Sequence, residues 1–286
     1  MIELAENRYG KSRVRLMKVT RHDQGPVKGQ DLREWTVQIL LKGDFNEAHV
    51  LGDNSKILPT DTMKNTVYSI ARSSKAVAME DFAKELVDFL LGRNPQVESA
   101  SVRIESTMWK RLTVDGAPHP SAFMRGSGEL QITTVERAQN GAFQILSGLD
   151  NLVILKTADS GFEGYIKDSL TTLPETKDRL FGTAVSATWR YIAHDLPFDC
   201  LRVKLRETML CTFANHDSKS VQQTLYAMAE SALNDVPEID EIELIMPNKH
   251  CLLVDLSRFG QDNPNEIFVP TDEPHGLIEA RVRRKL

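Results

Sequence analysis

The sequence predicts an α+β protein made of two copies of one unit, in which antiparallel strands carry helices on one face. Three observations predict this class. Alternating apolar and polar residues indicate strands, apolar residues three or four positions apart indicate helices, and the order of strands, helices and strands occurs twice along the 286 residues. Because no linker segment separates the copies, we place the boundary near Gly141, with a first domain at residues 1–140 and a second at 141–286.

The first copy opens with strands joined by a loop rich in glycine, proline and aspartate. Its expected strands lie at residues 14–21, 34–41, 97–109 and 128–137. Between the second and third strands, one helix begins near Thr62 and carries Val67 and Ala71 on one face. A second helix, at residues 79–91, ends at Gly92 because glycine favours helix termination.

The second copy repeats this order with one predicted helix. Its expected strands lie at residues 143–156, 181–193, 201–212, 239–246, 251–256 and 276–282. Ser220 to Gln223 have the spacing of a capping box, and Val221, Leu225 and Met228 follow at helical intervals. The sequence therefore predicts a helix that starts just after Ser220.

The composition excludes several classes of protein. A net charge of −5 and a pI of about 5.9, without a long basic block, argue against a nucleic-acid or anionic-membrane partner. Cys200, Cys211 and Cys251 form no CxxC pair, so neither a disulfide framework nor a zinc site is expected. There is neither a secretory leader nor a run of about 20 apolar residues, which favours a cytoplasmic protein. The final Arg-Lys-Leu lacks the small first residue of a peroxisomal signal.

The familiar motifs of cofactor chemistry are absent. There is no phosphate-binding GxxxxGK[ST], and Gly126-Ser127-Gly128 lacks the third glycine of a dinucleotide fingerprint. Neither HExxH nor GxSxG occurs, and the seven histidines are scattered without metal-ligand spacing. The sequence therefore predicts no metal site and no bound nucleotide or flavin cofactor.

Four segments together resemble the urate oxidase (uricase) family. They are YGK at residues 9–11, LPTDTMKNTVY at 58–68, DSGFEGY at 159–165 with Asp178-Arg179 behind it, and VQQTLY at 221–226 followed by MPNKH at 246–250. The resemblance implies two tandem T-fold (tunnelling-fold) domains, assembled as a homotetramer around a tunnel with active sites at subunit interfaces. It also implies a reaction in which urate, O2 and water give 5-hydroxyisourate and hydrogen peroxide with no metal or organic cofactor.

By this resemblance, Arg179 and Gln222 clamp the purine. A guanidinium donates two parallel hydrogen bonds to an anionic ring, and a carboxamide supplies both acceptor and donors in one plane. Val221 adds its backbone N–H group. From the residues alone, a surface ion pair with Asp178 is the favoured explanation of Arg179. Val221 and Gln222 can equally be first-turn residues of a capped helix, and that role is compatible with binding an anion.

Thr60 and Asp61 precede a helical pattern, and from spacing alone an N-cap is the favoured interpretation. The resemblance instead assigns both residues to substrate binding. This helix start is expected to hold the same place in the first copy as Ser220 to Gln222 in the second, which suits one site built from both starts across a subunit interface. Phe162 resembles the ring that stacks on urate and Leu173 a wall of that pocket, whereas core packing is the ordinary role of such a phenylalanine.

Lys11, Thr60 and His250 resemble the family's proton relay, and Asn248 the residue that holds oxygen or water above the ring. A threonine hydroxyl needs neighbours of adjustable charge before it moves protons, and a histidine titrates near neutrality. The ordinary alternatives are a solvated lysine, a structural histidine at a strand end and a turn asparagine after Pro247. The implied mechanism leaves the redox chemistry to the substrate, while the protein orients the ring and moves protons.

The sequence is also compatible with two other functions. One is another enzyme of the same fold group, such as a pterin-forming cyclohydrolase or aldolase, although the cyclohydrolases typically need a zinc cluster. The other is a catalytically silent purine-binding or structural tetramer. Metal analysis separates the first from a urate oxidase, and a urate absorbance assay separates the second.

Overall fold

The computed structural model describes residues 2–22 and 29–285, and it divides the chain into two compact units. The first unit is Met1–Gly148 with Arg190–Asp199, and the second is Leu149–Trp189 with Cys200–Leu286. The middle of the loop predicted between the first two strands, at residues 23–28, lies outside the described residues. The domain boundary predicted near Gly141 falls between two strands and stays a proposal.

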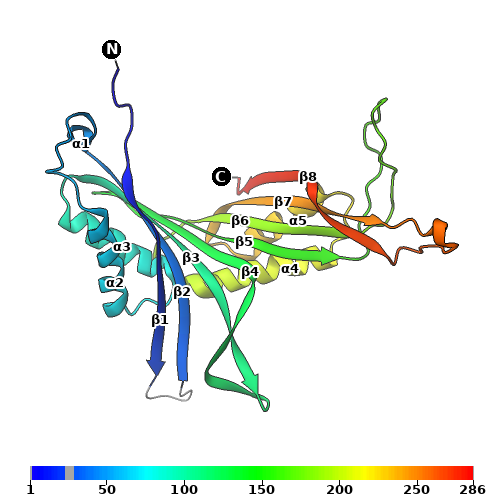
Figure 1. Cartoon of the computed structure of the whole chain (residues 1–286), viewed down its shortest axis with the longest axis horizontal. Coiled ribbons are helices and arrows are strands. Elements are labelled where there is room, and N and C mark those ends of the chain that lie inside the picture. The colour runs from blue at the N-terminus through cyan, green and yellow to red at the C-terminus, as the bar shows by residue number, and fades with distance from the viewer. Residues whose placement is uncertain (1, 23–28, 286) are drawn as a thin grey trace. The chain divides into compact units, whose positions relative to one another are not determined.

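The first unit pairs four long strands with helices (Figure 1). Its strands are β1 (Tyr9–His22), β2 (Gly29–Gly43), β3 (Val97–Val114) and β4 (Ala117–Ala138), and each is antiparallel to the next. Its helices are α1 (Asn46–Val50), α2 (Thr60–Ser73) and α3 (Met79–Arg93). Both α2 and α3 pack against this sheet, α2 on β1 and α3 on β3 and β4.

Alternation along β2 builds the core of the first unit. Val37, Ile39 and Leu41 are fully buried, while the residues between them are half-buried. Trp35 begins this buried row and stacks on Phe82 of α3 with ring centroids 5.0 Å apart. Because strand side chains alternate between faces, one face of β2 receives the helices.

The second unit has the same kinds of element in a similar order (Figure 1). Its elements are β5 (Gln144–Lys156), β6 (Phe181–Tyr191), α4 (Phe198–Asn215), α5 (Val221–Asp235), β7 (Ile239–Leu253), the short 3-10 helix η1 (Ser257–Phe259) and β8 (Phe268–Arg283). The first residues of β5 and α4 and the last two of β6 are assigned to the first unit. Helix α5 packs on β7 and β8. The predicted α+β class, with antiparallel strands and helices on one face, is thus confirmed in each unit.

The strand predicted at residues 201–212 is wrong, because this segment belongs to helix α4. Its alternating Leu201, Val203 and Leu205 imitate a strand, but Val203 is about half exposed. The buried apolar positions are Leu201, Leu205, Met209 and Phe213, which recur every fourth residue. That interval places them on one face of a helix.

Several strands are longer than predicted. The segments at 239–246 and 251–256 lie on one strand, β7, which continues through Pro247 and ends at Leu253. β3 and β4 extend to a tight hairpin in which Asp115 and Gly116 both have positive φ, of 52° and 78°. Polar residues in these extensions hide the alternation, since neither face there is deeply buried.

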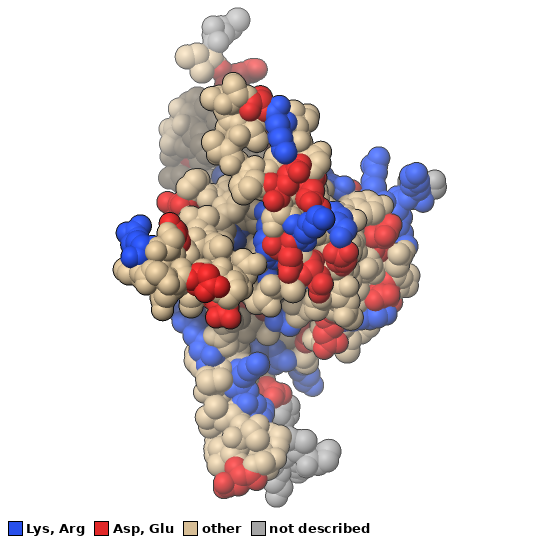
Figure 2. Space-filling view, turned by 90° about the vertical axis from the view of Figure 1, so that its right-hand side faces the viewer, with Lys and Arg blue, Asp and Glu red and all other residues tan. Residues whose placement is uncertain are grey.

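The surface mixes charges of both signs. On the face drawn in Figure 2, Lys and Arg side chains alternate with Asp and Glu side chains, and neither sign forms a continuous patch. In the described part of the chain, no helix is long and apolar enough to cross a membrane.

Candidate functional site

The predicted site residues divide between the two units. Lys11, Thr60 and Asp61 belong to the first unit. The second unit holds the other predicted positions, which are Phe162, Leu173, Arg179, Val221, Gln222, Asn248 and His250. Each group is built by its own elements.

In the first unit, Tyr9 ties the start of β1 to the segment before α2. Its hydroxyl accepts a hydrogen bond from the Leu58 N–H at 2.8 Å and donates one to the Leu58 carbonyl at 3.2 Å. Burial raises the pKa of Tyr9, so the hydroxyl keeps its proton and can donate. Leu58 is two residues before Thr60, and Tyr9 is two residues before Lys11. The pair of bonds therefore holds the approach to Thr60 against the strand that carries Lys11.

Gly10, between Tyr9 and Lys11, allows β1 to lie very close to β2. A Cβ at this position would lie 1.8 Å from the Ile39 carbonyl oxygen, which no side chain tolerates. Just after Lys11 the register of β1 against β2 shifts, and Arg13 has a positive φ of 58°. Lys11 thus sits on the regular strand immediately before an irregularity.

Thr60 is the first residue of α2 and does not cap it. Pro59 is the N-cap residue, and its carbonyl accepts the first helical hydrogen bond from Met63 at 3.2 Å. The capping interpretation of Thr60 is therefore wrong, because proline fixes the extended turn that starts the helix. Among the described residues the Thr60 hydroxyl has no hydrogen-bond partner, so it is available to a ligand.

Asp61 is held as a carboxylate by its neighbours. It accepts hydrogen bonds from Lys64, one turn later, and from Asn65 at 3.0 Å. Its pKa lies below the usual value, mainly because of Lys64, with smaller contributions from Asn65 and from the positive charge of Lys11. The influence of Lys11 shows that its ammonium lies within electrostatic reach of the α2 start.

In the second unit, a pocket of about 310 Å³ contains three of the predicted residues, Phe162, Leu173 and Arg179. The pocket is also lined by Thr157, Pro174, Thr176, Asp178, Leu180, Cys251, Leu253, Asn265 and Phe268. It combines an arginine with apolar and aromatic walls, as expected for a small-molecule site.

Arg179 has no polar partner within the described part of the chain. Its guanidinium carbon lies 5.3 Å from the centre of the Phe162 ring, and its Nε is buried without a hydrogen bond. Burial lowers the pKa of the guanidinium because the positive charge has lost water. The alternative ion pair with Asp178 is not formed, since that carboxylate accepts a hydrogen bond from the Ser160 N–H at 3.4 Å instead.

Phe162 is half-buried rather than a core residue. Its N–H donates to the Thr176 carbonyl at 2.7 Å and its carbonyl accepts from the Thr176 N–H at 3.1 Å. Its ring stacks on Tyr165, with centroids 4.8 Å apart and planes 15° from parallel. Tyr165 was missed as a site candidate, although it lies in the same DSGFEGY segment as Phe162.

The start of α5 confirms the predicted cap at Ser220. The Ser220 side chain accepts a hydrogen bond from the Gln223 N–H at 3.1 Å, while the Gln223 side chain accepts from the Lys219 N–H at 2.8 Å. Val221, the first residue of α5, is buried, whereas Gln222 is exposed. The Gln222 carboxamide has no partner among the described residues and is free to bind a ligand.

Asn248 and His250 both lie on β7, and neither is in a turn or at the strand end. Asn248 pairs with Gly276 and His250 with Thr271, and the register shifts between the two pairs. Both residues are half-buried. Within the described residues neither side chain has a hydrogen-bond partner.

Not all predicted residues meet in the pocket. Val221, Gln222, Asn248 and His250 do not line it, although Cys251, next to His250, does. Sequence reasoning also missed Thr157, Asn265 and Phe268, because a lone polar or aromatic residue far along the chain gives no local signal. In the part of the chain that the structure describes, no three His, Cys, Asp or Glu side chains gather as a metal site.

The two helix starts do not hold the same place in their copies. Apart from the short α1, α2 is the first helix after β2, whereas α5 is the second after β6. By order and by packing on the following strands, α5 corresponds to α3. The predicted equivalence is wrong because α4 was read as a strand.

Comparisons with known proteins agree over nearly the whole chain. The sequence model of the family described as Uricase matches residues 7–136 and 145–279. A uricase from Arthrobacter globiformis is 39% identical over 284 residues, covering 99% of this chain and 91% of that protein. One from Dictyostelium discoideum is 36% identical over 286 residues, covering 99% and 98%. The crystal structure of the Arthrobacter globiformis uricase is similar with a TM-score of 0.93 at 38% identity, covering 100% of this chain and 96% of that chain.

Proposed function

This chain belongs to the uricase family, and from that membership we propose that it oxidises urate with O2 and water to 5-hydroxyisourate and hydrogen peroxide, without a metal or organic cofactor. The observation that carries the proposal is Arg179, a half-buried cation without a polar partner among the described residues, beside an aromatic ring in a pocket. Desolvating a cation is unfavourable, so its natural complement is an anionic ligand.

The pocket suits a planar anion. The guanidinium donates paired, parallel hydrogen bonds to adjacent acceptors in one plane, which the oxygen and nitrogen atoms at the edge of urate provide. Phe162 offers an aromatic ring to stack on the purine, although that ring lies against Tyr165 in this structure. Leu173 then forms part of the pocket wall.

The start of α5 supplies a second set of contacts in the same unit. The Gln222 carboxamide is exposed and has no hydrogen-bond partner in the described part of the chain. The free N–H groups of the first turn, including that of Val221, favour an anion. In this proposal Arg179 and Gln222 hold opposite edges of urate. The ring is then fixed in its plane with its faces open to oxygen.

Proton transfer is assigned to Lys11, Thr60 and His250, with Asp61 in contact with the substrate. The Thr60 hydroxyl is not used by the helix start, and Tyr9 brings that start close to Lys11. Proton removal makes urate electron-rich enough to reduce O2. Water then adds to the oxidised ring, and the protons taken from urate and water return to the reduced oxygen as peroxide. Asn248 is assigned to hold O2, and afterwards water, above the ring.

We further propose that the two groups of residues complete one site from different subunits of a homotetramer. Among the described residues, β1 pairs only with β2 and β8 only with β7, so each presents an unpaired ladder edge. Strands of the second unit also expose large apolar side chains, namely Val153, Leu155, Leu252, Leu253, Val269 and Leu277. Such surface favours burial against another copy. A cytoplasmic location remains a proposal from the sequence.

Urate consumption by chelator-treated, dialysed protein tests the reaction. We expect the urate absorbance to fall while one hydrogen peroxide appears for each urate consumed. Recovery of activity only after addition of metal or flavin would refute the cofactor-free mechanism. Turnover of a pterin precursor by a zinc-containing sample would instead identify another enzyme of the fold group.

Complementation tests the shared site. Lys11→Met and Arg179→Met change different units, so each variant alone should be inactive. If a site joins two subunits, co-expressed variants form some sites that carry neither change, and activity returns. Light scattering of the same samples reports the assembly. Well-mixed oligomers that stay inactive would place both groups of residues within one chain.

A further inference from the structure

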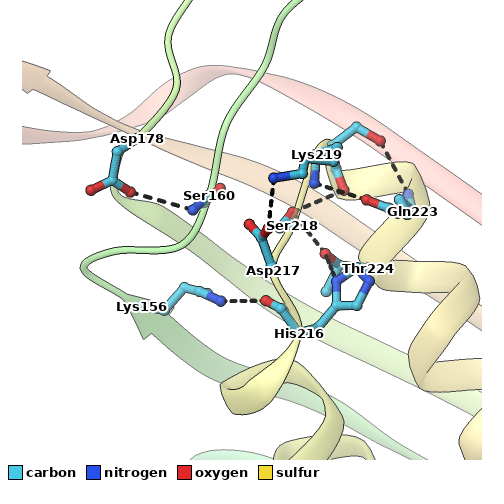
Figure 3. Close-up of polar contacts among 10 residues, drawn as sticks. Lys156, Ser160, Asp178, His216, Asp217, Ser218, Lys219, Gln223 and Thr224 are labelled. Carbon is cyan, nitrogen blue, oxygen red and sulfur yellow. Dashed lines mark hydrogen bonds and ion pairs between the residues drawn. The ribbon is translucent and has the colours of Figure 1, made fainter.

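We propose that the side chains of His216, Thr224 and Ser218 form a positioning array that sets the Phe162 segment against the start of α5. The inference rests on the proposed function, because it assigns these residues to alignment of the two purine contacts within the second unit. None of the three lies among the predicted site residues. Figure 3 shows them between the Ser160 segment and the first turn of α5.

The three side chains form one continuous hydrogen-bonded chain. His216 Nδ1 lies 3.0 Å from Thr224 Oγ1, which donates to Ser218 Oγ at 2.8 Å. Ser218 Oγ in turn donates to the Ser220 carbonyl at 3.1 Å. Thr224 and Ser218 are fully buried, so water does not replace these bonds.

The hydrogens available determine the direction of the chain. Ser218 has one hydroxyl proton, which goes to the carbonyl, so its oxygen must accept from Thr224. Thr224 then has no proton left, and its oxygen accepts from His216 Nδ1–H. Burial and the charge of Lys156 lower the pKa of His216, which favours the neutral ring, and the bond to Thr224 requires the ring proton on Nδ1. The three hydrogen bonds therefore run in one direction, from His216 to Thr224, from Thr224 to Ser218 and from Ser218 to the Ser220 carbonyl.

On one side the array holds the segment that leads to Phe162. Ser218 N–H donates to the Asp159 carbonyl at 2.9 Å, and its carbonyl accepts from the Gly161 N–H at 2.8 Å. These bonds make a parallel bridge between Ser160 and Ser218. Gly161 immediately precedes Phe162, so a shift of Ser218 moves the stacking ring.

On the other side the array holds the start of α5. Ser220, whose carbonyl accepts from Ser218, is also the residue that caps the helix. Val221 and Gln222 follow directly, and Thr224 itself lies in the first turn. The backbone of His216 is fixed as well, because Lys156 Nζ donates to its carbonyl at 2.6 Å. The distance from the aromatic ring to the carboxamide is thereby set by Ser218.

If the array positions the purine contacts, breaking it should weaken substrate binding and leave kcat nearly unchanged. The hydrogen bonds that link the three side chains and Ser220 include none of the residues assigned to proton transfer, so a bound urate should react at the normal rate. Thr224→Val keeps the shape of the side chain but removes the hydroxyl, and it leaves Ser218 without its donor. We expect the KM for urate and the Kd for xanthine, a purine without the 8-oxo group, to rise about tenfold, which is one lost hydrogen bond. kcat should stay within about twofold.

The controls separate positioning from stability. Thr224→Ser restores the hydroxyl and should return KM and Kd to the wild-type values. Thr212→Val, in α4 of the same unit, removes a hydroxyl that bonds only the Thr208 carbonyl at 2.9 Å, so it should change the melting temperature and not Kd. The side chain of asparagine at position 216 would offer an N–H group near the place of His216 Nδ1, so it can donate to Thr224, whereas leucine offers no donor. His216→Asn should bind xanthine like the wild type, and His216→Leu should match Thr224→Val.

The outcomes distinguish the array from the reaction. Wild-type KM and Kd in both Thr224→Val and His216→Leu would overturn the array, as would equal weakening by Thr212→Val. A loss of kcat without a change in Kd would also overturn it. A wild-type protein that does not consume urate would refute the proposed reaction, while the Kd series with xanthine would still test the array.

Discussion

Arg179 offers the sharpest test, because its replacement should affect binding and stability in different directions. In this structure its guanidinium is half-buried, has no polar partner among the described residues and carries a lowered pKa from burial. The free protein therefore holds a desolvated charge that a ligand would neutralise. Arg179→Lys keeps the charge but loses the paired donors.

The expected size follows from the bonds involved. A hydrogen bond to a charged group contributes about 1.5–3 kcal/mol, and lysine replaces one of the two that the guanidinium can donate to urate. A loss of about 2–3 kcal/mol corresponds to a Kd for xanthine roughly 30- to 140-fold higher. Arg179→Met should bind more weakly still, yet its melting temperature should not fall below that of the wild type, because the buried charge is gone.

Isothermal titration with xanthine, steady-state urate kinetics and thermal melting supply the three readouts. Arg258→Lys, an exposed change in the same unit, serves as the control and should leave all three unchanged. If Arg179→Lys binds xanthine within twofold of the wild type, the clamp assignment is refuted. A clear drop in the melting temperature of Arg179→Met would show that the cation stabilises the free fold.

Four further predictions concern the relay, the start of α2, His216 and Cys251. Lys11→Met and Thr60→Ala should each lower kcat more than they lower the affinity for xanthine. The kcat of the double variant should be close to that of the more damaged single variant, because a relay acts as a unit. Losses of kcat that add in the double variant would argue against a relay. Thr60→Ala should leave the melting temperature unchanged, since Pro59 and not Thr60 starts the helix. His216 faces Lys156, Lys219 and Asp217, and its pKa is lowered chiefly by burial. Below about pH 6.5 the unfolded chain therefore binds more protons at this histidine than the folded protein does, so the free energy of unfolding should fall as the pH drops. In denaturant titrations at several pH values, His216→Asn should reduce this dependence on pH. An unchanged dependence would contradict the lowered pKa. Cys251 lines the pocket, so Cys251→Ala should change the KM for urate a few-fold at constant kcat, and loss of turnover at full stability would reveal a thiol role.

Local patterns predicted most of the fold correctly. The alternation on β2 and the Ser220 cap depend on residues that are close together in the sequence, so the sequence alone predicts them. Helix α4 was misread because Leu201, Val203 and Leu205 satisfy a strand period over a short stretch, and only burial of Met209 and Phe213 reveals the longer helical period. That error then produced the false equivalence between the starts of α2 and α5.

The site was less accessible to sequence reasoning. The residues named from the resemblance fall into one group in each unit, and the shared pocket contains only Phe162, Leu173 and Arg179 of them. No periodicity reveals that Arg179 lacks a polar partner among the described residues, since this depends on where Asp178 points. The backbone hydrogen bonds of Ser218 to Asp159 and Gly161 likewise cannot be predicted from the sequence, because they join segments about 60 residues apart and involve no side chain.

The two hydrogen bonds between the Tyr9 hydroxyl and Leu58 also have a consequence for the loss of activity on heating. These bonds lie at the N-terminal end of β1, where Tyr9 also pairs with Leu41 of β2 and lies edge-on to Phe45 with ring centroids 4.8 Å apart. Chain ends open at lower free energy than the core. Local fraying there would separate Lys11 from Thr60 while Trp35 and the rest of the core remain packed. Inactivation should then precede global melting, and the Leu58 amide should exchange with deuterium at the temperature where activity begins to decline.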